Sequence, residues 1–98
     1  MNSLSIKLRD GFSHDTVTIT VNGKEVYRKS GVKTDLTISF ADAVEVSVAE
    51  SVVNLEVAIA DGQRVAKEIR VQETPFVEVW VSEGRMELRA SKEEVPML

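Results

Sequence analysis

The chain has 98 residues, of which 12 are lysine or arginine and 16 are aspartate or glutamate, giving a formal net charge of −4 at pH 7. This length suits one domain. The lack of cysteine excludes disulfides and thiolate metal sites. The basic residues are scattered beside acids, which argues against a nucleic-acid or anionic-membrane partner. We expect a cytoplasmic location, because the first residues lack the apolar segment of a secretory signal and no run of about 18 apolar residues could span a membrane.

Apolar and polar residues alternate through most of the chain, and each break in this pattern holds turn-forming residues. A period of two is typical of strands with one buried face. Valine and threonine are frequent in these segments, and their β-branched side chains favour a sheet. The first strand is predicted at residues 4–8, where Leu4, Ile6 and Leu8 share one face, and a loop follows at residues 10–15.

The next two alternating segments flank Asn22-Gly23. This dipeptide predicts a β-hairpin, because both residues tolerate the positive φ of a type I′ turn. A two-residue turn would place Ile19 opposite Val26 and, on the other face, Thr18 opposite Tyr27.

The segment after this hairpin has two interpretations. We predict a loop at residues 30–35 and strands at residues 36–40 and 44–48, with a turn at residues 41–43. The apolar positions keep the same parity across residues 41–43. One bent strand that serves both sheets is therefore the alternative.

Strands at residues 53–59 and 65–71 flank the next turn, Asp61-Gly62. A two-residue loop would put Val65 on the wrong face. A three-residue loop that includes Gln63, with a G1-type bulge, aligns Ile59 with Val65 and Leu55 with Ile69.

The last hairpin follows a break at Pro75, since proline cannot donate to a strand ladder. A turn at Glu83-Gly84 would place Val81 opposite Met86 and Trp80 opposite Glu87, with Glu78 opposite Arg89. Residues 1–91 are thus predicted to form one domain and residues 92–98 a C-terminal tail. The apolar end of this tail, residues 95–98, could fray, cover Trp80 or serve as a recognition peptide.

The predicted fold class is all-β, an antiparallel two-sheet sandwich of eight or nine short strands. Turn signals every 8–12 residues or so are typical of sandwiches and barrels, and strands with one apolar face suit two sheets packed face to face. The expected architecture is immunoglobulin-like or fibronectin-like. This likeness concerns architecture alone, because the cysteine–tryptophan–cysteine pattern of antibody domains is absent.

No catalytic or cofactor motif is present, and we expect no cofactor and no enzymatic activity. The single histidine, His14, lies in a predicted loop, and a nucleophilic triad needs a base that contacts both a nucleophile and an orienting acid. A hydrolase or isomerase that uses two loop carboxylates ranks last, since nothing in the spacing singles out such a pair.

Calcium is harder to exclude than zinc, because it binds oxygen ligands alone. If the strands alternate in direction, five acidic residues come from loops at one end of the predicted sandwich. The short glycine turns then gather at the other end. Acids also recur in turns for local reasons, so no metal site is assigned. The five loop acids are Asp10, Asp15, Asp35, Glu50 and Glu73.

The outward aromatic residues are the candidate binding residues. Trp80 has the opposite parity to its valine neighbours, so it should stand on the outer face, with Phe76 on the same side. Together with Tyr27, these residues suggest a binding or assembly module that contacts a protein partner or a second copy. The alternative is a carbohydrate-binding module with a structural calcium. A third reading has Trp80 covered by the tail or by a curl of the sheet.

Overall fold

The computed structural model describes residues 2–35, 37–38, 40–60 and 62–92. These residues form eight strands. The described part of the chain contains no helix that is long and apolar enough to cross a membrane. The strands are β1 (Asn2–Leu8), β2 (Asp15–Val21), β3 (Lys24–Val32), β4 (Asp42–Val48), β5 (Val52–Ile59), β6 (Arg64–Arg70), β7 (Phe76–Ser82) and β8 (Arg85–Ser91).

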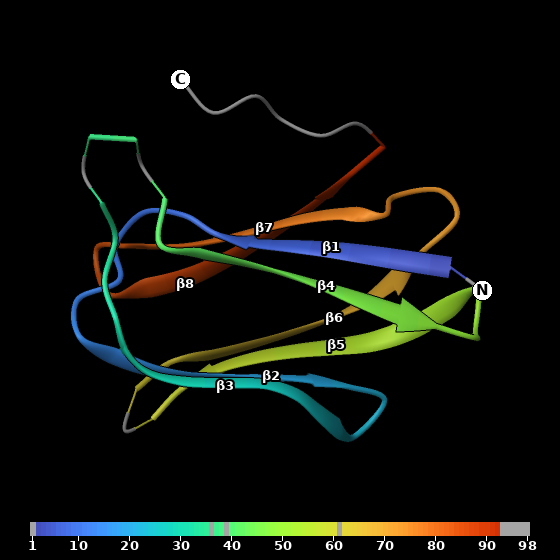
Figure 1. Ribbon diagram of the computed structural model, residues 1–98, viewed down its shortest axis with the longest axis horizontal. Coiled ribbons are helices and arrows are strands. Elements are labelled where there is room, and N and C mark those ends of the chain that lie inside the picture. The colour runs from blue at the N-terminus through green and yellow to red at the C-terminus, as the bar shows by residue number, and fades with distance from the viewer. Residues whose placement is uncertain (1, 36, 39, 61, 93–98) are drawn as a thin grey trace.

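The strands form two sheets of four that pack face to face (Figure 1). Sheet A has the order β4-β1-β7-β8, and sheet B has the order β3-β2-β5-β6. All neighbours are antiparallel except β1 and β7, which run parallel. The predicted all-β two-sheet sandwich is confirmed, with this one parallel pair as an addition that strand parity could not reveal.

The core lies between the sheets and follows the predicted alternation. Leu4, Ile6 and Leu8 of β1 are buried, and they belong to one cluster with apolar residues of both sheets. Each fully buried leucine, isoleucine or valine contributes about 1.5–3 kcal/mol by leaving water. Inward parity therefore sets which face of every strand meets the core.

The β2–β3 hairpin turns at Asn22-Gly23 as predicted, with φ of 51° and 80°. Its register is predicted correctly only near the turn. An irregularity follows, and Ile19 lies opposite Tyr27 rather than Val26. A bulge of this kind places two residues of one strand opposite one of the other, so the pairing beyond it shifts.

A second irregularity lets β3 continue to Val32, so the loop predicted at residues 30–35 is shorter than expected. The strand predicted at residues 36–40 is wrong. Asp35 and Phe40 form an isolated bridge around a turn, and the Asp35 carboxylate accepts a hydrogen bond of 2.9 Å from the Thr37 N–H. This local bond is typical of an Asx turn and competes with strand pairing. Leu36 lies outside the described residues.

The predicted turn at residues 41–43 is also wrong, because Asp42 already begins β4. The chain thus crosses from sheet B to sheet A through residues 33–41. One strand fewer reverses the direction expected for every later strand.

The loop acids are consequently divided between the two ends of the sandwich. Asp10 and Asp15 flank the β1–β2 loop and Asp35 lies in the β3–β4 connection, both at the left end in Figure 1. Glu50 and Glu73 lie in the β4–β5 and β6–β7 loops, at the right end. Among the described residues, no three histidine, cysteine or acidic side chains lie close enough together to hold a metal ion.

The β5–β6 hairpin keeps the predicted faces but not the predicted register. Val57 lies opposite Val65 and Val53 opposite Ile69, a shift of two residues. The Ile59 N–H donates to the Gln63 carbonyl at 2.9 Å, which places the tight turn one residue earlier than expected. Gly62 has no left-handed φ, which the predicted G1 bulge requires.

The β7–β8 hairpin has the predicted register throughout. Val81 lies opposite Met86, and Trp80 lies opposite Glu87. Val77 and Val79 are buried, so the even-numbered residues of β7 point away from the core. The tail at residues 95–98 lies outside the described residues.

Candidate binding surface

The outer face of sheet A carries two of the three aromatic residues predicted to bind. β7 lies between β1 and β8, and its outward residues are Phe76, Glu78, Trp80 and Ser82. Phe76 and Trp80 are half-buried on this face. The predicted orientation of Trp80, away from the core, agrees with its cross-strand neighbour Glu87, which is exposed.

Trp80 lines a shallow hollow of about 230 Å³ together with Arg9, Asp10 and Glu78. The Arg9 guanidinium and the Glu78 carboxylate form an ion pair of 2.5 Å, and their side chains are only 16% and 13% exposed. The hollow therefore combines an indole ring with charged groups that are already fixed in place. We call these four residues the Trp80 surface.

The backbone explains why Arg9 and Asp10 reach β7. The Arg9 N–H donates to the Val79 carbonyl at 2.7 Å, and the Val81 N–H donates to the Asp10 carbonyl at 2.8 Å. These bonds continue the parallel β1–β7 pairing beyond the end of β1. The turn that follows brings Gly11 against the backbone of Val81.

Sequence reasoning missed Arg9 and Asp10 as members of this surface. They are about 70 positions from Trp80, and no local signal indicates that β1 and β7 are parallel neighbours. The one signal that the sequence offers is the period of two in β1, which places Arg9 on the outer face with Lys7.

Tyr27, the third predicted binding residue, does not belong to the Trp80 surface. It lies on β3 at the edge of sheet B, and its hydroxyl donates a hydrogen bond of 2.7 Å to Oδ2 of Asp42 on β4. Lys29 Nζ also lies 3.3 Å from the same oxygen. Burial and the Asp42 carboxylate raise the pKa of the Tyr27 phenol. This cluster links the two sheets.

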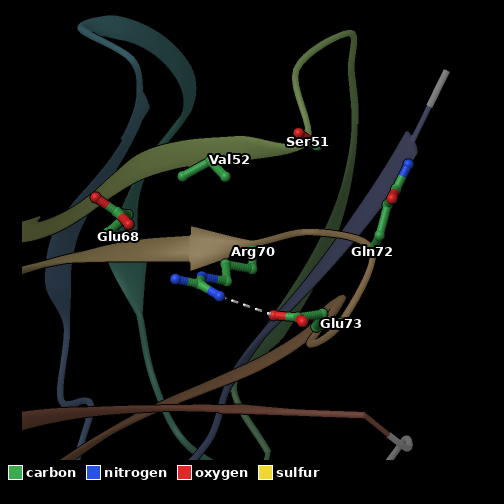
Figure 2. A pocket seen from close by; sticks show the side chains of 6 residues that line it. All are labelled: Ser51, Val52, Glu68, Arg70, Gln72 and Glu73. Carbon is green, nitrogen blue, oxygen red and sulfur yellow. Dashed lines mark ion pairs between the residues drawn. The ribbon is translucent and has the colours of Figure 1, made fainter.

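Two further hollows lack aromatic residues. One, of about 270 Å³, lies at the end of β6, where Val52 is 44% exposed and Arg70 lies 3.6 Å from Glu73 (Figure 2). The other, of about 350 Å³, separates the edges of β3 and β4 and is lined by Val26 and Val46, among other residues. Neither offers the pairing of an aromatic ring with fixed charges that the Trp80 surface has.

His14 is exposed in the loop immediately before β2, with a φ of 53°. The neighbouring Asp15 carboxylate accepts a hydrogen bond from the Ser13 N–H at 2.9 Å, so it serves the local turn.

Comparison with known proteins adds no relative, since this chain matches no protein-family model, no curated protein and no solved structure.

Proposed function

We propose that this chain is a non-enzymatic binding module that recognises a protein partner through the Trp80 surface. The observation that carries the proposal is the half-buried indole of Trp80 beside the Arg9–Glu78 ion pair on the outer face of sheet A. Tryptophan and arginine are enriched among the residues that dominate protein interfaces. A side chain fixed before binding loses less conformational entropy when a partner arrives.

The size of the hollow favours a protein over a small molecule. Its volume of about 230 Å³ is less than the roughly 300–1,000 Å³ of pockets that enclose small ligands. A partner that lies across the face would cover the hollow and Phe76 together. The charged residues around the indole would then become the polar rim of the interface.

A carbohydrate ligand is the second candidate, because Asp10, Glu78 and Arg9 offer hydrogen-bonding groups beside a flat ring. Phe76 lies four residues from Trp80 along β7, about 13 Å at the rise of a strand. The two rings would therefore contact different sugar units of an oligosaccharide. Tyr27 would take no part, since it lies at the β3 edge.

The remaining features of the proposal come from the sequence. A cytoplasmic location is consistent with the lack of cysteine. The absence of a nucleophile–base motif supports a non-enzymatic role. The likeness to immunoglobulin and fibronectin domains stays a prediction about architecture, supported by the two packed sheets.

The test compares three full-length proteins: wild type, Trp80→Ala and Val52→Ala. Val52 is the matched control, because it is an exposed apolar residue on the outer face of the other sheet. Proteins captured from a lysate of the source organism are purified and titrated against each variant. We expect Trp80→Ala to weaken binding by about tenfold or more, while Val52→Ala binds as wild type does.

Equal binding by wild type and Trp80→Ala would contradict the proposal. The emission of the single tryptophan provides the second arm. A shift on titration with oligosaccharides, and none with the captured proteins, would replace the protein partner with a carbohydrate.

A further inference from the structure

The sandwich has four edge strands, and an edge strand exposes backbone groups that can pair with another chain. β4 and β8 are the edges of sheet A, and β3 and β6 are the edges of sheet B. Each of these edge strands could in principle pair with the same strand of a second molecule. In an antiparallel pair that uses the whole strand, the residue at the midpoint lies opposite itself.

Three of the four edges carry a charge at this midpoint. The central residue is Arg28 in β3, Glu45 in β4 and Lys67 in β6. Self-pairing over the whole strand would set like charges directly opposite each other, which is destabilising. Like charges therefore oppose self-pairing of these three edges in the register that uses the whole strand.

Two of these edges carry additional protection. β3 has two irregularities in its register with β2, which bend an edge away from a flat partner. In β6, Lys67 has the same parity as Val65 and Ile69, so a charge sits on the inward side of the edge. Inward charges of this kind are a common defence against edge-to-edge pairing.

β8 has none of these three features: no charged midpoint, no irregular register and no inward charge. Its seven residues pair with β7 without irregularity, and its midpoint is the half-buried Leu88. The two flanking residues, Glu87 and Arg89, carry opposite charges. Antiparallel pairing about Leu88 would place Glu87 opposite Arg89 of the partner subunit, and Arg89 opposite the partner's Glu87. Its charges therefore complement themselves.

We propose that β8 pairs antiparallel with β8 of a second copy, in the register centred on Leu88. Sheets A of the two molecules would form one continuous eight-stranded sheet. Shifting the register by two residues in the N-terminal direction sets Glu87 opposite the partner's Glu87, and shifting it the other way sets Arg89 opposite the partner's Arg89. Charge therefore favours the register centred on Leu88 over the two registers shifted by two residues.

This dimer goes beyond the proposed function, because it uses an edge and not the Trp80 surface. Trp80 lies next to Glu87 across the β7–β8 pair. Each Trp80 would therefore share a row with Glu87 and with Arg89 of the partner subunit. The dimer presents two Trp80 surfaces on the same side of one sheet, which would bind a partner with two matching sites more tightly than one surface alone.

The test uses charge exchange in the full chain, measured by sedimentation velocity over a range of concentrations. Glu87→Arg places arginines opposite each other, and Arg89→Glu does the same with glutamates. We expect each change to raise the dissociation constant by about tenfold or more. The double variant, with both changes, should dimerise again. A mixture of the two single variants should form heterodimers, because every cross-strand pair is then complementary.

The control variant is Glu45→Arg at the midpoint of β4, which still opposes like charges and should leave dimerisation unchanged. Circular dichroism and thermal unfolding check that each variant folds. A wild type that stays monomeric at all concentrations would overturn the proposal. So would folded single variants whose mixture fails to assemble. Retention of Trp80-dependent binding by monomeric Glu87→Arg separates this outcome from a failure of the proposed function.

Discussion

The Tyr27 hydroxyl on β3 lies 2.7 Å from Oδ2 of Asp42 on β4, and this hydrogen bond joins the edges of the two sheets. Lys29 approaches the same oxygen at 3.3 Å. The cluster lies at the point where the chain, having crossed from one sheet to the other, begins β4.

Replacing Tyr27 with phenylalanine removes this link and little else. We expect the free energy of unfolding to fall by about 1–2 kcal/mol, since a hydrogen bond to a charged group is lost from a half-buried site. Urea denaturation measures the change. Ser3→Ala is the control, because Ser3 donates to Glu45 at 2.6 Å on the exposed surface. A loss no larger than that of the control would show that the link does not stabilise the fold.

The same cluster predicts a loss of stability in acid. Burial would raise the pKa of the Asp42 carboxyl, but hydrogen bonds from Tyr27, the Ala43 N–H and Lys29 outweigh it and lower the pKa below the ordinary 3.8. A carboxyl with a lowered pKa in the folded state stabilises the protein above its unfolded pKa. This contribution is lost as the pH falls below about 4. As the pH falls through this range, the free energy of unfolding measured by urea denaturation should decrease less for Asp42→Asn than for wild type. An equal decrease would contradict the assignment.

At high pH the Tyr27 phenol should act in the opposite sense. Its pKa is raised, mainly by burial and then by the Asp42 carboxylate, so the folded state keeps the proton longer than the unfolded state does. The contribution is complete below the ordinary pKa of 10.0 and is lost as the pH rises above it. If this is correct, the thermal unfolding temperatures of wild type and Tyr27→Phe should converge as the pH is raised from neutral to strongly alkaline.

Gly11 follows Asp10 of the Trp80 surface in the chain and lies against the backbone of Val81. Its φ is +91°, and a Cβ at this position would lie 2.0 Å from the Val81 carbonyl oxygen. We expect Gly11→Ala to cost at least about 2 kcal/mol, because backbone strain and a backbone clash add. Gly31→Ala is the control: its φ is +68° with no atom within 4 Å, so it should cost about 1 kcal/mol. Equal losses of stability would show that the close approach to Val81 is unimportant.

The Arg9–Glu78 ion pair should contribute more than the ion pairs at the surface. Glu78→Gln removes the carboxylate from a pair that is mostly buried, and we expect a loss of about 1–3 kcal/mol. Glu25→Gln breaks the Arg28–Glu25 pair, whose side chains are 65% and 47% exposed, and it should cost less than about 0.5 kcal/mol. Chemical denaturation of both variants decides the comparison, and similar losses would argue against a fixed ion pair beside Trp80.

The sequence was informative where structure depends on near neighbours. In β7, alternation alone identified Val77 and Val79 as core residues and turned Trp80 outward. The β7–β8 register followed from a two-residue turn. The same reasoning failed in β3, because a bulge inserts a residue without changing the type of side chain on either side.

The assignment of residues 36–40 failed for a related reason. An alternating pattern is necessary for a strand but also occurs by chance, and here the Asp35 carboxylate stabilises a turn. Because of that one error, Glu50 and Glu73 were predicted to lie at the wrong end of the sandwich. Only Trp80 and Phe76 of the predicted binding residues share a face, because Tyr27 lies on β3 in the other sheet. The shifted register also pairs Tyr27 with the buried Ile19, so the prediction that Tyr27 points outward is wrong.

The amino-acid order by itself determined the fold class, the buried face of most strands and the outward position of Trp80, because side-chain alternation and turn chemistry act over a few residues. Tertiary structure decided which strands lie side by side: the parallel contact of β1 with β7 that brings Arg9 to Trp80, and the edge position of β8. These choices depend on packing between segments far apart in the chain, where each strand offers similar backbone groups to any neighbour, so local pattern cannot select among them.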